Sequence, residues 1–196
     1  MEHLILASLL LHCGPARQRA ARRGEVYHLH LSGPYHPRMS SSVAPLPQWD
    51  HLDVNELVAR WPATRPLAVI HSGGSTGPWA RWSIVAPPRG HLRLSDSGAS
   101  WSGPSWPRLE TALAGQAPDD PIALIETALQ VDPAGGSGGG DSPPLPFPGG
   151  WLLSLSYELG GIVEPSTCPA VGPLADLLWC PDAFVHDGHA GTWWKV

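Results

Sequence analysis

Charged residues are scarce in this chain of 196 residues, and those present are mostly acidic. Only 15% of residues are charged, with 12 lysines and arginines against 17 aspartates and glutamates. A typical soluble domain has roughly 25%. The formal net charge of −5 opposes binding to a phosphate backbone by bulk electrostatics. We therefore expect no nucleic-acid partner.

Cysteine is also scarce, with only Cys13, Cys168 and Cys180. An odd number of widely spaced cysteines favours a reducing compartment, so we expect a cytoplasmic protein. Cys168, Cys180, His186 and His189 have the pattern C-x11-C-x5-H-x2-H. This pattern lacks the close cysteine pair that structural zinc sites normally use, so we expect no metal ligands.

The apolar run Leu4–Leu11 is too short for a membrane-spanning helix, which takes about 20 apolar residues. Only Glu2 and His3 precede it, whereas a secretory signal has positive charge before its apolar core. Arginines instead follow the run. We expect no membrane association. An exported or anchored protein is an alternative that depends on this run alone and would need a processed N-terminus.

Glycine and proline are abundant, with 22 and 23 residues, about twice their usual combined share of roughly 12%. Each costs about 1–3 kcal/mol inside a helix, which excludes a mainly helical protein. Ten tryptophans favour a packed structure over disorder. The composition predicts a compact, strand-rich and loop-heavy protein. With the helices and strands predicted along the chain, this gives an α+β fold, mainly antiparallel β-sheet with a few short helices.

A charge shift marks a boundary near residue 38. Residues 1–38 hold five arginines and two acidic residues, whereas the remainder is strongly acidic. The only other methionine, Met39, opens the acidic part. We therefore interpret 1–38 as an N-terminal extension or mis-assigned start, and 39–196 as one domain.

Periodicity and breaker residues predict the main elements of that domain. Helices are expected at 53–61, with Asp53 as N-cap and Glu56 completing a capping box, and at 121–130. Residues 133–144 read as a flexible linker. Strands are expected at 66–71 (buried), 79–86, 91–95, 149–157, 174–186 and 192–196, the last two as a hairpin around 186–189.

The residues alone define no active site. The glycine-rich stretch 73–77 precedes a strand rather than a helix, so it lacks the helix N-terminus that holds a phosphate. No Gly-x-Ser-x-Gly elbow is present. The ten histidines are scattered, and Glu158 and Glu164 have no fixed separation.

Two stretches carry a family pattern. The first is Leu-Ala-Val-Ile-His-Ser-Gly-Gly at 67–74, followed by Trp-Ala-Arg-Trp-Ser-Ile-Val-Ala at 79–86. The second is Leu-Pro-Phe-Pro-Gly-Gly-Trp-Leu-Leu-Ser-Leu-Ser-Tyr-Glu-Leu-Gly at 145–160, with Glu164. Residues 62–196 thereby resemble the N-terminal domain of anthranilate synthase component I and aminodeoxychorismate synthase component I, the chorismate-utilising enzymes. The His-Ser-Gly form at 71–73 is more similar to the aminodeoxychorismate branch.

The resemblance implies a non-catalytic region truncated before the chorismate-binding catalytic domain. The complete family enzyme aminates chorismate to 4-amino-4-deoxychorismate for folate biosynthesis, using Mg²⁺ and a glutamine amidotransferase subunit. The family's N-terminal domain also contributes part of a tryptophan pocket. By position, Ser72 corresponds to the pocket serine, Trp79 to a stacking ring and Arg81 to the arginine opening the next strand. No catalytic residue is implied within this chain.

Two positions depart from the family pattern. Leu153 stands where the family usually has glycine, and Gly161 where an arginine is common. The missing arginine puts the family's domain interface in doubt. Two alternatives therefore stay open. One is the N-terminal region of anthranilate synthase component I with a tryptophan feedback site, and the other is a free-standing aromatic amino-acid-binding module without catalysis.

Overall fold

A computed structural model describes residues 43–71, 80–131, 145–163 and 172–196. The strands are β1 (Ala44–Pro45), β2 (Ala68–Ile70), β3 (Trp82–Ala86), β4 (Gly90–Ser95), β5 (Gly98–Ser102), β6 (Gly150–Leu155), β7 (Ala175–Cys180), β8 (Phe184–Asp187) and β9 (Thr192–Lys195). The helices are α1 (Val54–Arg60), α2 (Pro107–Ala114), α3 (Pro121–Gln130) and α4 (Gly160–Val163), with 3₁₀ turns η1 (Pro47–Trp49) and η3 (Tyr157–Leu159).

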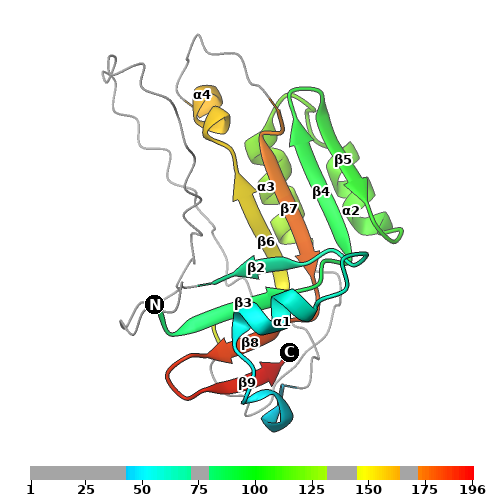
Figure 1. Ribbon diagram of the computed structural model, residues 1–196. Coiled ribbons are helices and arrows are strands. Elements are labelled where there is room, and N and C mark those ends of the chain that lie inside the picture. Colours follow the sequence, from blue (N-terminus) through cyan, green and yellow to red (C-terminus); the bar gives the residue numbers. More distant parts are fainter. Residues whose placement is uncertain (1–42, 72–79, 132–144, 164–171) are drawn as a thin grey trace, which may run out of the picture.

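The strands form two antiparallel sheets. The five-stranded sheet has the order β1-β9-β8-β3-β2, and the four-stranded sheet has the order β5-β4-β7-β6. The chain passes between the sheets from β3 to β4 and from β7 to β8, and the five-stranded sheet lies across one end of the other (Figure 1). The expected α+β fold with mainly antiparallel sheet is confirmed.

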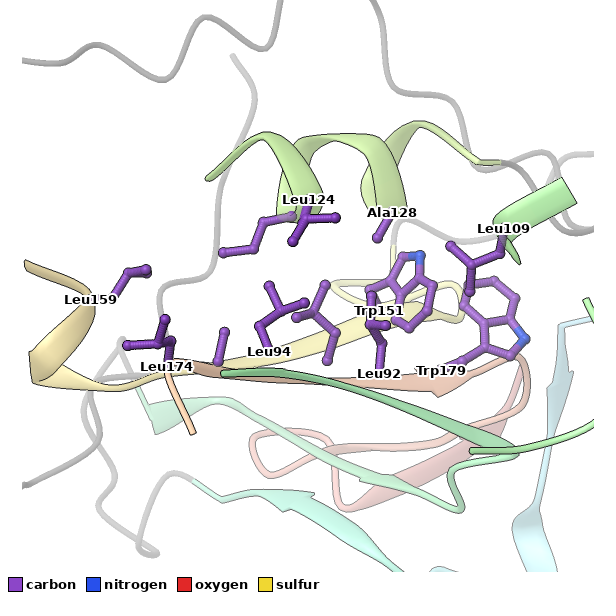
Figure 2. Close-up of a cluster of buried hydrophobic side chains, with 12 residues drawn as sticks. Leu92, Leu94, Leu109, Leu124, Ala128, Trp151, Leu159, Leu174 and Trp179 are labelled. Carbon is purple, nitrogen blue, oxygen red and sulfur yellow. The ribbon is translucent and has the colours of Figure 1, made fainter. Parts of the chain in front are cut away.

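The largest core cluster lies between the four-stranded sheet and helices α2 and α3 (Figure 2). Strand residues of one parity point toward these helices, because side chains alternate across a strand. The buried members of this cluster are Leu92, Leu94, Leu109, Leu124, Ile125, Ala128, Trp151, Leu159, Leu174, Ala175, Leu177 and Trp179. The indole rings of Trp106 and Trp151 stack within it, with centroids 5.6 Å apart.

Two smaller hydrophobic clusters lie on the two faces of the five-stranded sheet. On one face, Val54 and Leu57 of α1 pack against Val85 and Trp193. On the other face, a junction cluster joins the two sheets through residues such as Ile84. Its buried members are Ile84, Ala86, Phe147, Cys180, Ala183, Val185 and Val196.

Local sequence explains the two expected helices. Asp53 accepts a hydrogen bond from the backbone N–H of Glu56 at 2.8 Å, and the Glu56 carboxylate accepts one from the Asp53 N–H at 3.3 Å. These bonds form the predicted capping box of α1. Helix α3 begins at Pro121 with Asp120 as N-cap, whose carboxylate accepts from the Ala123 N–H at 2.9 Å.

Two expectations are corrected, and two elements were not predicted. The 66–71 strand is not buried, because β2 is an edge strand whose Val69 is 40% exposed. The 174–186 run is not one strand but splits into β7 and β8, which lie in different sheets. Strand β5 and helix α2 were not expected at all. The 133–144 linker lies outside the described residues.

Candidate functional site

The candidate site lies at the end of the five-stranded sheet where β2 ends and β3 begins. Of the three predicted ligand-binding residues, the structure describes Arg81. Ser72 and Trp79 belong to the β2–β3 connection and lie outside the described residues. Trp82 of β3 lies opposite Asp187 of β8, which lies opposite Thr192 of β9, so the β8–β9 turn shares this end.

Arg81 is bound by Asp187. Its Nε donates to both carboxylate oxygens of Asp187 at 3.0 Å, and Nη2 donates to Oδ2. The guanidinium also lies over the Trp82 ring, 4.5 Å from its centroid, in a cation–π contact. The Arg81 side chain remains 46% exposed, so its outer side is open to solvent.

Asp187 is almost fully buried and organises the β8–β9 turn. Its carboxylate accepts from the backbone N–H groups of His189 at 3.0 Å and Ala190 at 3.3 Å. The hydrogen bonds from Arg81 lower the pKa of Asp187 and outweigh the opposing effect of burial, and the backbone donors lower it further. The same pair raises the pKa of Arg81. The Arg81–Asp187 ion pair therefore holds the start of β3 against the β8–β9 turn.

A second polar group lies on the opposite face of the same sheet end. His71 Nδ1 and the Ser83 hydroxyl are 2.9 Å apart, and Ser83 lies directly opposite His186. Ser83 is 3% exposed, so its hydroxyl cannot reach a substrate in solvent. The His186 ring packs on Trp193, with centroids 4.7 Å apart. These residues can hydrogen-bond and position neighbours, but they are not arranged for nucleophilic attack.

Sequence reasoning missed Ser83 and the pairing of His186 with it. Alternation places residues 83 and 85 on one face of β3, and residues 184 and 186 on one face of β8. Alternation does not give the register between two strands that are about one hundred residues apart. The sequence signal for Ser83 is a polar residue between Trp82 and the apolar run 84–86.

A third polar cluster lies on the face of the four-stranded sheet that α2 and α3 leave open. Asp176 accepts hydrogen bonds from His91 Nε2 at 2.5 Å and from Arg93 Nε at 2.9 Å. Partial burial raises the pKa of Asp176, but the hydrogen bonds and charges of Arg93 and His91 outweigh this effect, so the net shift is downward. His91 and Arg93 alternate along β4, as expected for the solvated face of an antiparallel sheet.

Cys180 and His186 of the C-x11-C-x5-H-x2-H pattern lie on opposite faces of the five-stranded sheet. Cys180 is buried in the junction cluster, whereas His186 packs on Trp193 on the α1 side of the five-stranded sheet. Cys168 lies outside the described residues. Within the described parts of the chain, no group of three metal-ligating side chains is close enough to hold a metal ion.

No protein-family model matches the sequence, and no curated protein matches it. Among the described residues, no helix is both long enough and apolar enough to cross a membrane.

Proposed function

We propose that this chain is the N-terminal, non-catalytic region of an enzyme like aminodeoxychorismate synthase component I. In such an enzyme a separate domain binds chorismate and aminates it. The present region packs against that domain and contributes part of a pocket for tryptophan. The proposal rests on the two stretches that resemble the family and on the way they pack against each other in the structure.

The observation that carries the proposal is that both stretches meet in one core. Ile84 and Ala86 from the first stretch pack in the junction cluster with Phe147 from the second. Partly buried side chains from both stretches complete the contact: Ala68, Ile70, Trp82, Leu145 and Leu152. Residues 87–144, which number 58, separate the stretches in sequence. Their shared packing supports reading them as parts of one structural pattern.

The glycine pair of the second stretch has a structural reason. Gly149 and Gly150 have φ angles of 95° and 130°, a region that side-chain-bearing residues rarely adopt. This turn brings the chain into β6, which contributes Trp151 to the largest core cluster and Leu152 to the junction cluster. The Gly-Gly motif thus sets the position of a strand that serves both cores.

The departure at position 153 is compatible with the fold. Leu153 lies opposite Leu177 of β7 and packs against the largest core cluster. A leucine there adds apolar contact where the family usually has glycine. Gly161, where an arginine is common, lies in the short helix α4.

Arg81 is the proposed pocket residue that the structure describes. It lies just before β3, at the end of the β2–β3 connection that carries Ser72 and Trp79. A serine hydroxyl can bond the ammonium or carboxylate of an amino acid, and a flat ring can stack on indole. The partners of the proposal are the chorismate-binding catalytic domain and a glutamine amidotransferase subunit, and Mg²⁺ belongs to the catalytic domain. The closest alternative is the corresponding region of anthranilate synthase component I.

Equilibrium dialysis of the full chain against radiolabelled L-tryptophan tests the pocket. We expect saturable binding by the wild type and loss of binding in Ser72→Ala and Trp79→Ala. Ser100→Ala on β5, an exposed serine in the other sheet, is the matched control and keeps wild-type binding. Binding that is unchanged in Ser72→Ala would overturn the pocket assignment.

The second candidate function is a free-standing aromatic amino-acid-binding module. It is favoured by the small number of large apolar side chains that are exposed within the described part: Val58, Val69, Leu155 and Tyr157. They are distributed over α1, β2, the end of β6 and the following turn rather than gathered on one element. A monodisperse monomer that binds tryptophan without a catalytic domain would favour this candidate.

A further inference from the structure

Asp187 ends β8 and Gly188 begins the β8–β9 turn, so an Asp-Gly pair lies at this end of the five-stranded sheet. In such a pair the glycine nitrogen can attack the aspartate side-chain carboxyl carbon, because glycine has no side chain to obstruct the approach. The packing explains why glycine stands here. A Cβ at Gly188 would lie only 3.2 Å from the Arg81 carbonyl oxygen. Close contact with the start of β3 therefore places a chemically labile pair in the turn.

Side-chain and backbone donors together hold the Asp187 carboxylate in place. The Arg81 guanidinium donates to both carboxylate oxygens, through Nε at 3.0 Å and through Nη2. The Oδ1 atom also accepts from the backbone N–H groups of His189 at 3.0 Å and Ala190 at 3.3 Å. The carboxyl group must leave these donors before its carbon can turn toward the Gly188 nitrogen. Charge-assisted hydrogen bonds such as those from Arg81 are the strongest of these restraints.

The attacking nitrogen is restrained as well. The Gly188 N–H donates to the Arg81 carbonyl oxygen at 2.7 Å. The nitrogen must lose this proton to become a nucleophile, so the hydrogen bond keeps it unreactive. The hydrogen bonds from the Arg81 guanidinium also lower the pKa of Asp187, which keeps the carboxylate ionised near neutral pH. Water leaves readily only from the neutral acid, so the ion pair opposes the reaction at this step too.

We propose that Asp187–Gly188 is a latent isomerisation site that the Arg81 side chain protects. When the Arg81 side chain releases the carboxyl group, the Gly188 nitrogen bonds to the side-chain carboxyl carbon of Asp187. The carboxyl hydroxyl and the amide proton leave together as water. The cyclic imide then adds water, and the bond between its nitrogen and the main-chain carbonyl carbon breaks. The product is isoaspartate, which has the same mass as aspartate and joins Gly188 through the former side chain.

Isoaspartate at position 187 would disrupt this end of the five-stranded sheet. It lengthens the main chain by one carbon atom at a residue that lies opposite Trp82 of β3 and Thr192 of β9. It also removes the side-chain carboxylate that binds Arg81. Isomerisation would therefore separate the start of β3 from the C-terminal hairpin. The inference needs neither the proposed ligand nor the proposed catalytic domain.

Ageing of the full chain at mildly acidic pH tests this inference. Isoaspartate is labelled with a protein isoaspartate methyltransferase and radioactive S-adenosylmethionine, and is located by peptide mapping. We expect at least about fivefold faster formation at position 187 in Arg81→Ala than in the wild type. Arg89→Ala, which removes the exposed ion pair with Asp182, is the matched control and keeps the wild-type rate. Asp96 and Ser97 in the exposed β4–β5 turn are the internal reference, whose rate stays the same in all variants.

Two results would overturn the inference. One is an equal rate at position 187 in the wild type and in Arg81→Ala. The other is an equal rise in Gly90→Ala, which is expected to destabilise the four-stranded sheet and leaves Arg81 intact. If Arg81→Ala does not fold, the wild type is aged both native and in urea. A rate ratio between positions 187 and 96 that rises on unfolding supports protection by the fold, and an unchanged ratio contradicts it.

Discussion

Arg81 and Asp187 lie 106 residues apart in sequence, yet they form a bidentate ion pair at the end of the five-stranded sheet. Each partner orders a different part of the chain. Arg81 precedes β3 and follows the β2–β3 connection, while Asp187 also binds two backbone N–H groups of the β8–β9 turn. The pair thus links the proposed ligand-binding connection to the C-terminal hairpin.

Asp187→Ala should lower the melting temperature by about 5 °C or more. The change removes a buried carboxylate that accepts hydrogen bonds from Arg81 and from two backbone N–H groups. These donors then lose their acceptor within the protein. The matched control is Asp182→Ala, which removes the exposed ion pair with Arg89 and should change the melting temperature by only about 1–2 °C. Calorimetry of both variants measures the difference, and equal shifts would contradict the structural role of Asp187.

The Arg81–Asp187 pair also predicts a pH dependence. The pKa of Asp187 is lowered in the folded protein, so the unfolded chain takes up this proton first. The stabilisation is complete above the ordinary carboxyl pKa of about 3.9 and is lost as the pH falls below it. Urea unfolding should show a steeper loss of stability below about pH 4 in the wild type than in Asp187→Asn. Parallel pH profiles would refute this.

Two glycines should respond in opposite ways to alanine. A Cβ at Gly90 would collide with the Trp101 ring, so Gly90→Ala should destabilise the protein by about 1–3 kcal/mol and change the near-UV circular dichroism. Gly160 has open space around its Cβ position and helical φ and ψ angles, so Gly160→Ala should be neutral or stabilising by up to about 1 kcal/mol. Denaturant titration of both variants tests the packing at Trp101. A neutral Gly90→Ala would show that this packing is wrong.

Cys180 should not react in the folded protein. Burial raises the pKa of its thiol to about 12, so the reactive thiolate is scarce near neutral pH. In a Cys13→Ala, Cys168→Ala double variant, a chromogenic disulfide reagent should detect no thiol until denaturant is added. Rapid modification of the native double variant would contradict the burial of Cys180 in the junction cluster.

The elements predicted well from sequence are those with local signals. Helix α1 has its capping box, and α3 has Asp120 and Pro121 at its start and apolar residues at helical spacing. Helix α2 carried a similar signal that was missed, with Pro107 at its first position and Glu110 accepting from the Trp106 N–H. Local capping chemistry marks α1 and α3 in the sequence, whereas the N-cap residue of α2, Trp106, makes no side-chain capping bond.

Sheet partners could not be predicted, because pairing is non-local. The 174–186 run has strand character throughout, but Pro181 interrupts it and the two halves enter different sheets. The exposed edge position of β2 likewise depends on where β3 and β8 pair, which apolarity alone does not reveal. For the same reason, the sequence alone does not predict that Ser83 contacts His71 and lies opposite His186. Both relationships depend on the register of β2, β3 and β8.

The most direct test of the proposed function is to purify the native gene product from its source cells and measure its intact mass and its activity. The account predicts a species of more than twice 20.9 kDa that aminates chorismate to 4-amino-4-deoxychorismate when given ammonia and Mg²⁺. A product of 20.9 kDa or less that has no such activity, alone or with the amidotransferase subunit, would contradict it.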